Sequence, residues 1–362
     1  MSLAGDLLAA VWVATDYAEC EGCHELTKVR FGDGDEMRIG HFGCLSRMIE
    51  VEPVVIAPPA ATLRFLDDLM GEKYRPRKLH EGKLVGPYWR PPLPEVADLV
   101  EPSGWAWSRP AGGVEVAVLD RNGAHHSSAA SVLVAHGPLE QTGPDVTGRP
   151  GLYKMPWAPW TESLPHPLGG AARIGERTGS VWVVHTRAEL LWQLAREGRY
   201  PECEPLDSYT CEAAVRLDKW TKHLSEIRAV ALTKYGADSD QYGQFKNAYS
   251  QAITLMIGTR ERGGARRWKS KVHRPDWGWA VQELSSVTLW RWCDELTQLA
   301  HYHGHPEWAP VGMRAVDELL VPSAAVDWFT ATERLGGKRP LRIDPTGLAL
   351  GTFKIKGLEV AA

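Results

Sequence analysis

Residues 114–143 read VEVAVLDRNGAHHSSAASVLVAHGPLEQTG, and the valine-rich run that opens this stretch ends in an acid, Asp120. A continuous apolar run predicts a β-strand that is buried on both faces. The letters RNG then turn the chain into a segment of small residues and histidines, which predicts a helix over 124–134. A carboxylate at this exit stands where the sheet stops and where solvent or a ligand begins. The alternative is an ordinary cap or turn residue.

The composition is that of a globular protein. The 362 residues are 44% hydrophobic and 24% charged, enough for two or three domains or for one palm-like or barrel body. No apolar stretch approaches the roughly 18 residues of a membrane span. The first residues carry an acid and no basic region ahead of their apolar segment, unlike a signal peptide. We therefore expect a cytoplasmic protein without a membrane partner. A net charge of −4 argues against binding nucleic acid over the whole surface, but it permits a local basic channel.

The first 52 residues contain a pattern that predicts a structural zinc site. A C-x-x-C pair is followed, after a loop, by H-x-x-C, which is the two-plus-two spacing of such sites. The expected ligands are Cys20, Cys23, His41 and Cys44, with His24 as the alternative nitrogen donor. Four ligands leave no open position for water, so we expect a structural metal. A redox pair or plain buried cysteines are the alternatives.

A second local pattern is the basic segment TRERGGARRWKSKVHRP at 259–275. Glycines and a tryptophan lie among its basic residues, and this combination favours contact with phosphates and stacking on a base. A solvated loop is the alternative. The candidate nucleic-acid-binding side chains are Arg266, Arg267, Lys269 and Lys271.

The remaining chain divides by its periodicity. Residues 53–112 are rich in proline and predict a linker or extended arm. Beyond them, helical periodicity predicts helices over 187–199, 217–233, 241–258 and 277–300, and apolar runs predict strands at 179–186 and 312–323. The helices at 217–233 and 241–258 would form a hairpin.

The order of these elements resembles that of family B DNA polymerases, and most of all the protein-primed phage enzymes. The segment LDRNGAHHSSAAS resembles motif A, FKNAYSQAI (245–253) resembles motif B, and MRAVDELLV (313–321) resembles motif C. LALGTFKIKG (348–357) is similar to the stretch that follows motif C. The resemblance covers about residues 113–357.

This resemblance implies an α+β fold, with a palm of antiparallel sheet and helices, a helical-hairpin fingers subdomain and the small N-terminal zinc-binding module. The expected boundaries are a zinc module to residue 52, an arm over 53–112 and a palm from 113–216, followed by fingers and the basic loop at 217–275. The second part of the palm and a reduced thumb would occupy 276–362. From the short stretch before motif A we expect no proofreading exonuclease domain.

The resemblance also implies template-dependent nucleotidyl transfer with two metal ions, Mg²⁺ or Mn²⁺, bridged by carboxylates from adjacent strands. Asp120 and Asp317 would hold these ions, with the carbonyl of Arg121 as a further ligand. His125 stands where the family has the tyrosine that screens the sugar. The triphosphate would be neutralised by Lys246, assisted by Arg228 or Lys234. The implied partners are a DNA or RNA primer and template, nucleoside triphosphates, and a protein primer or replication partner.

Two departures keep other functions open. Ala315 stands at the first aspartate of motif C, and motif B lacks its Asn-Ser-x-Tyr-Gly. The first hypothesis is a minimal polymerase without an exonuclease, of the kind a mobile element carries. The second is a palm without catalysis that binds nucleic acid or regulates. The third is an enzyme with a transition metal bound by the histidines at 125–126 or in HYHGH at 301–305.

Overall fold

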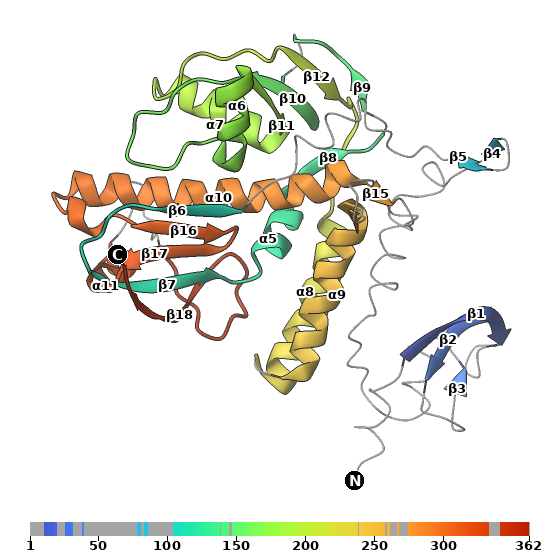
Figure 1. Cartoon of the computed structure of the whole chain (residues 1–362). Helices are drawn as coiled ribbons and strands as arrows, with labels where there is room; N and C mark the ends of the chain where they lie inside the picture. The colour runs from blue at the N-terminus through green and yellow to red at the C-terminus, as the bar shows by residue number, and fades with distance from the viewer. Residues whose placement is uncertain are drawn as a thin grey trace.

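The protein is represented by a computed structural model, shown in Figure 1, that describes most of the chain beyond residue 103. The exceptions there are residues 138, 145–146, 238, 258, 261–265, 268–273, 333–340 and 362. Before residue 104 the structure describes only the backbone of five strands: β1 (Val11–Glu19), β2 (Leu26–Phe31), β3 (Arg38–Ile39), β4 (Lys78–His80) and β5 (Lys83–Val85). The predicted zinc ligands Cys20, Cys23, His41 and Cys44, and the alternative His24, lie outside the described residues.

A five-stranded antiparallel sheet forms the base of the fold, in the order β18-β7-β17-β16-β6. Its strands are β6 (Trp105–Ser108), β7 (Glu115–Arg121), β16 (Gly312–Ala315), β17 (Glu318–Pro322) and β18 (Phe353–Val360). The valine-rich run of the sequence is β7, which is paired on both sides. The edge strand β6 lies in the stretch that was predicted to be an arm. Local sequence does not predict this strand, because its partner β16 lies about two hundred positions later in the chain.

The two faces of this sheet differ. Ala117 and Leu119 point to the inner face, where they join a large core with α10 (Pro275–Tyr302) and α11 (Ser323–Ala331). Val116 and Val118 point to the outer face, where they pack with Val311 and Leu320 in a small cluster. Side chains alternate between the faces of a strand, so Asp120 belongs to the outer face.

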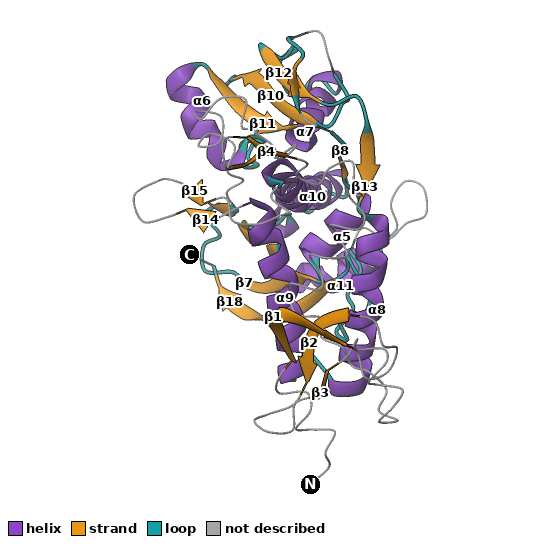
Figure 2. Cartoon of the chain, turned by 90° about the vertical axis from the view of Figure 1, so that its right-hand side faces the viewer, coloured by secondary structure: helices purple, strands orange, loops and turns teal. Residues whose placement is uncertain are grey.

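Helix α10 separates this sheet from a second subdomain, as Figures 1 and 2 show from two directions. The second subdomain has a four-stranded sheet in the order β11-β10-β12-β9 and two helices. Its elements are β9 (Glu140–Gln141), β10 (Gly151–Pro156), α6 (Ala172–Thr178), β11 (Ser180–Val184), α7 (His185–Arg196) and β12 (Asp207–Thr210). Tyr153 and Leu190 from this subdomain share the core of α10 with Leu119 of β7. Burial on two sides explains why α10 carries apolar residues around most of its circumference.

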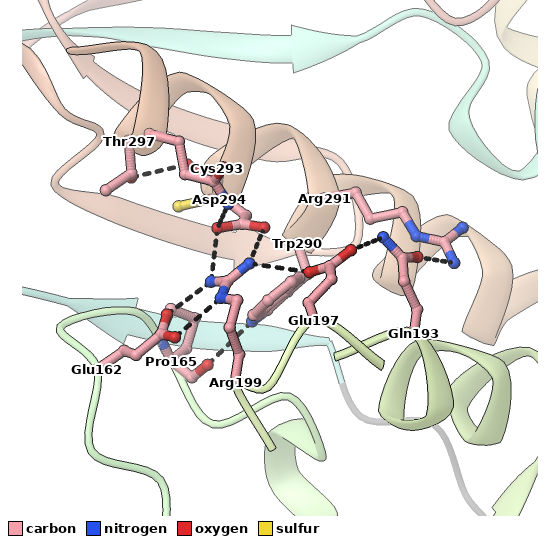
Figure 3. A network of polar contacts seen from close by, with 11 residues as sticks. Glu162, Pro165, Gln193, Glu197, Arg199, Trp290, Arg291, Cys293, Asp294 and Thr297 are labelled. Atoms are coloured by element: carbon pink, nitrogen blue, oxygen red, sulfur yellow. Dashed lines mark hydrogen bonds and ion pairs between the residues drawn. The ribbon is translucent and has the colours of Figure 1, made fainter. Parts of the chain in front are cut away.

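An arginine also joins this subdomain to α10 (Figure 3). The Arg199 guanidinium donates to both carboxylate oxygens of Glu162, at 2.8 and 2.6 Å, and to both of Asp294 on α10, at 2.8 Å each. It also lies over the rings of Trp160 and Trp290, about 6 Å from each centroid. These contacts fix the end of the α7 segment against the long helix.

The predicted helical hairpin is present as α8 (Asp218–Tyr235) and α9 (Asp240–Ile257), which project from the body in Figure 1. Its base packs on α5 (Ala124–Ser131), on the start of α10 and on a two-stranded sheet of β8 (Leu133–Ala135) and β13 (Ala214–Arg216). The buried His126 of α5 joins it to α8, since its Nε2 lies 2.9 Å from the carbonyl of Thr221 and 3.0 Å from the Ser225 hydroxyl.

The remaining described elements are short. They are the strand pair β14 (Thr259–Arg260) and β15 (Arg266–Arg267), and the 3₁₀ turns η2 (Gly169–Ala171) and η3 (Pro306–Trp308). Among the described residues, no helix combines the length and the apolar character needed to cross a membrane.

Candidate active site

Asp120 lies at the outer-face end of β7, next to two lysines. Its side chain is 13% exposed, with Oδ2 3.2 Å from the Lys354 ammonium and Oδ1 3.6 Å from that of Lys356. Lys354 is the direct partner of Asp120 in the register between β7 and β18. Lys356 lies two residues further along β18, on the same face as Lys354, and reaches the same carboxylate; the register with β7 is irregular at this point, between Ile355 and Gly357.

Asp317 lies in the turn between β16 and β17, next to the end of β7. The sequence predicted one strand over 312–323, and this prediction is wrong, because the run folds back on itself at Val316 and Asp317. Ala315 enters the turn with a φ of +50°, in the left-handed region that residues other than glycine rarely adopt. The Asp317 carbonyl accepts a hydrogen bond of 2.8 Å from the backbone N–H of Arg121. The hairpin thus brings the two predicted aspartates to neighbouring strands.

The electrostatics of Asp317 show that the two carboxylates interact. Burial, and after it the negative charge of Asp120, raise the pKa of Asp317 to about 6. The charges of Lys356 and Arg121 act in the opposite direction. Asp317 is therefore an acid whose protonation depends on which cations lie beside it.

The sequence did not single out three residues of this site: Glu318, Lys354 and Lys356. Glu318 pairs directly with Asp120 across β17 and β7, and its carboxylate lies 2.6 Å from the Lys356 ammonium. This contact raises the pKa of Lys356. The alternation in FKIK was a signal, because it puts two lysines on one face of a strand. Only the tertiary structure shows which strand they face.

Arg121 and His125, two further residues predicted to belong to the site, follow Asp120 in the chain. Arg121 is 7% exposed, and its Nη2 donates to the Ser127 hydroxyl at 2.7 Å. His125 lies in the first turn of α5, where burial and the charge of Arg121 lower its pKa to about 4. This histidine is neutral at pH 7.

The hairpin residues predicted to bind the triphosphate contact groups other than the two acids. Lys234 and Lys246 are exposed, and each ammonium lies over a tyrosine ring of its own helix, at 5.9 and 5.4 Å from the centroid. Within the part of the chain that the structure describes, neither makes an ion pair with Asp120 or Asp317. Arg228 is buried, and its guanidinium donates to backbone carbonyls.

The four residues predicted to bind nucleic acid belong to the basic segment at 259–275. Arg266 and Arg267 are described as backbone in β15, whereas Lys269 and Lys271 lie outside the described residues.

Among the described residues, no group of three or more His, Cys, Asp or Glu side chains is arranged to hold a metal ion. This contradicts the hypothesis of a transition-metal site in HYHGH. The rings of both His303 and His305 lie against Trp328, and His305 also stacks on Trp308.

Known structures provide the comparison for this fold, since no model of a protein family matches the chain and no curated protein sequence does so. Phi29 DNA polymerase in an orthorhombic crystal form matches with a TM-score of 0.50 and 11% sequence identity, over 87% of this chain and 55% of that chain. The same polymerase in a ternary complex with primer-template DNA and incoming nucleotide substrates has a TM-score of 0.49, also at 11% identity and with the same coverage. The chain spans about half the length of the solved polymerases that it matches. Its mixed helices and antiparallel sheet therefore form a DNA polymerase-like fold that corresponds to part of phi29 DNA polymerase.

Proposed function

We propose that the protein is a nucleotidyltransferase that adds nucleotides to a nucleic-acid primer at the site of Asp120 and Asp317. One observation carries this proposal: the turn between β16 and β17 holds Asp317 beside the end of β7, where its carbonyl accepts a hydrogen bond from the Arg121 N–H, and the charge of Asp120 contributes to its raised pKa. Such a pair repels itself unless a cation lies between its members, and nucleotidyl transfer uses such a pair of carboxylates to hold divalent ions.

The donor set suits Mg²⁺ or Mn²⁺. Both ions prefer carboxylate oxygens, and Mg²⁺ keeps several waters while binding only one or two carboxylates and the substrate phosphates. Asp120 and Asp317 would hold the ions, and Glu318 on the same edge is instead paired with Lys356. When bound, the ions would supply charge neutralisation and would activate the attacking oxygen.

The chain's own residues have separate tasks in this proposal. Lys354 and Lys356 hold the Asp120 carboxylate from the side of β18. Lys354 and Lys356 would also be within reach of phosphate oxygens of a nucleotide bound at this edge, as ammonium groups suited to charge-assisted hydrogen bonds. Lys246 and Lys234 would approach the triphosphate from the hairpin. The neutral His125 would lie near the sugar.

Extension of a labelled primer tests the proposal. Asp120→Asn and Asp317→Asn should each reduce the rate by at least about a thousandfold, because each removes charge from the transition-state site. Glu115→Gln is the matched control, since Glu115 is exposed at the opposite end of β7. Wild-type protein that adds no nucleotide to any primer, with Mg²⁺ or Mn²⁺ and with ribo- or deoxyribonucleotides, would overturn the proposal.

A second function has its own supporting observation. Two lysines neutralise Asp120, and Ala315 supplies no carboxylate where the resembled motif has one. Both features fit a palm that binds nucleic acid without catalysis. Calorimetric titration with Mn²⁺ separates the two functions, because only the nucleotidyltransferase requires a metal site that is lost in Asp317→Asn.

The basic loop would supply contacts to nucleic acid in either function. Replacing Arg266, Arg267 and Lys269 together with alanine should flatten the salt dependence of binding by up to about three units of slope, since each phosphate contact releases about one counterion. An unchanged slope would mean that the loop is only solvated.

We also propose that Cys20, Cys23, His41 and Cys44 bind one structural Zn²⁺. Four soft ligands at this spacing form the closed site typical of small metal-stabilised modules. Freshly purified protein should contain about one equivalent of zinc, and Cys23→Ser should lose it. Protein purified without added chelator that contains no zinc would contradict this.

A further inference from the structure

The loop of residues 344–352, which precedes β18, lies between the acid site and the helical hairpin. Its first residue organises it: the Asp344 carboxylate accepts hydrogen bonds from the backbone N–H groups of Thr346, at 3.0 Å, and Ala349, at 2.7 Å. The hydroxyl of Thr346 donates to the same carboxylate at 2.6 Å, and this contact lowers the pKa of Asp344. With its own polar groups bonded to one another, the loop behaves as a unit.

One side of this loop is bonded to Asn122, which is 4% exposed and lies two residues beyond Asp120. The Asn122 amide nitrogen Nδ2 donates to the Asp344 carbonyl and to the Thr352 hydroxyl, at 3.0 Å each. Its backbone N–H donates to the Thr352 carbonyl at 2.7 Å, and its carbonyl accepts from Gly351 at 2.9 Å. Four bonds thus fix the turn after β7 to the loop.

The other side of the loop is bonded to Arg228, near the middle of α8. Arg228 is 4% exposed, and its Nη1 donates to the Leu348 carbonyl at 2.8 Å, while its Nη2 donates to the Gly347 carbonyl. The planar guanidinium is well suited to hold two neighbouring acceptors, and a lysine could not reproduce both bonds. A buried cation is also costly to release from its acceptors. Helix α8 therefore cannot shift relative to the loop without breaking strong contacts.

These contacts form a continuous connection from the hairpin to the acid pair. Arg228 holds the loop, the loop holds Asn122, and the adjacent Arg121 donates its backbone N–H to Asp317. We propose that Arg228 is a positioning residue: it couples the α8–α9 hairpin to the carboxylates of the site through the 344–352 loop, and it does not bind the nucleotide. The kinetic part of the test rests on the proposed function, whereas the coupling itself does not.

Hydrogen exchange tests the coupling without any activity. Arg228→Met keeps the length of the side chain and removes its donors, and Arg228→Lys keeps the charge in case the methionine variant does not fold. We expect amide exchange to become about tenfold faster or more in 344–352 and also in 117–123, while the middle of α10 is unchanged. Lys222→Met, an exposed position on the same helix, is the matched control and should change neither segment. Faster exchange in 344–352 alone, or in neither segment, would overturn the coupling.

Kinetics distinguish positioning from nucleotide binding. A positioning residue predicts that Arg228→Lys lowers kcat by about tenfold or more with little change in KM for the nucleotide. A higher KM with an unchanged kcat would instead make Arg228 a nucleotide ligand and overturn the proposal. If no variant, including the wild type, extends a primer, the proposed function fails, while the exchange result still decides whether the hairpin and the acid pair are coupled.

Discussion

Two clusters of charged side chains lie on different sides of the main sheet, and they differ in how completely they are paired. On the α10 side, Arg199 makes two bonds to each of two carboxylates and lies over two tryptophan rings. On the outer face, the carboxylates of Asp120, Asp317 and Glu318 lie around two lysine ammonium groups. In the first cluster, the guanidinium donors of Arg199 are bonded to both carboxylates. Such an arrangement is typical of an ion pair that joins two parts of a fold.

The second cluster has an excess of acids among its outer-face members. Its lysines are 34% and 50% exposed, so that solvent and ligands reach them, and the pKa of Asp317 is raised to about 6. Acids with shifted pKa values beside accessible cations are typical of binding and catalytic sites. Fully paired ion networks are instead typical of contacts between structural elements. The difference suggests opposite responses to mutation, and the following predictions test them.

The largest effect on folding is expected at Arg199. Arg199→Met leaves two partly buried carboxylates facing each other, and we expect the free energy of unfolding to fall by about 3 kcal/mol. Urea denaturation measures this change, and Arg177→Met, at an exposed position of α6, is the control. A loss below about 1 kcal/mol would mean that the Arg199 network contributes little to stability, and it would contradict the proposed difference between the two clusters.

The second prediction concerns Asp317, whose replacement should stabilise the protein. Because its folded pKa is raised to about 6, the native state binds a proton that the unfolded chain has already lost. Stability therefore decreases as the pH rises from about 4 to about 6, and it stays lower above this range. Asp317→Asn should remove this pH dependence and raise the free energy of unfolding at pH 7 by about 1 to 2 kcal/mol, after allowance for partial exposure.

Urea denaturation at pH 4.5 and at pH 7 measures the effect. A variant that is less stable than the wild type at pH 7 would show that Asp317 is held by favourable contacts, as the carboxylates around Arg199 are. Asp327→Asn, on the exposed face of α11, serves as the control for loss of one acid.

The smallest effect is expected for the lysines. Lys356→Met should raise the pKa of Asp317, since the charge of Lys356 lowers it, and Lys354→Met should leave that pKa nearly unchanged. Both variants should change the free energy of unfolding by less than about 1 kcal/mol, because exposed ion pairs contribute little. NMR titration of the Asp317 carboxyl measures the shift. Equal shifts of the Asp317 pKa in both variants would contradict the prediction that Lys356 affects this pKa more than Lys354 does.

The helices were predicted better than the sheet. The predicted helices at 217–233 and 241–258 differ from α8 and α9 by at most two residues at each end, and 277–300 lies inside α10 by two residues at each end. Helical periodicity is a local property, so a window of the sequence contains it. In contrast, the run at 312–323 was read as one strand, since its reversal depends on which strands accept its two halves.

The candidate site divides in the same way. The sequence by itself identified Asp120 as the end of a buried strand, because continuous burial and a terminal acid are written in consecutive residues. It also identified Asp317, through a resemblance of order and spacing. Only the tertiary structure decided that Glu318 and the two lysines join them and that Arg228 holds a loop. Those pairings are set by sheet register and by contacts between residues 38 to 236 positions apart, which no local pattern of side chains encodes.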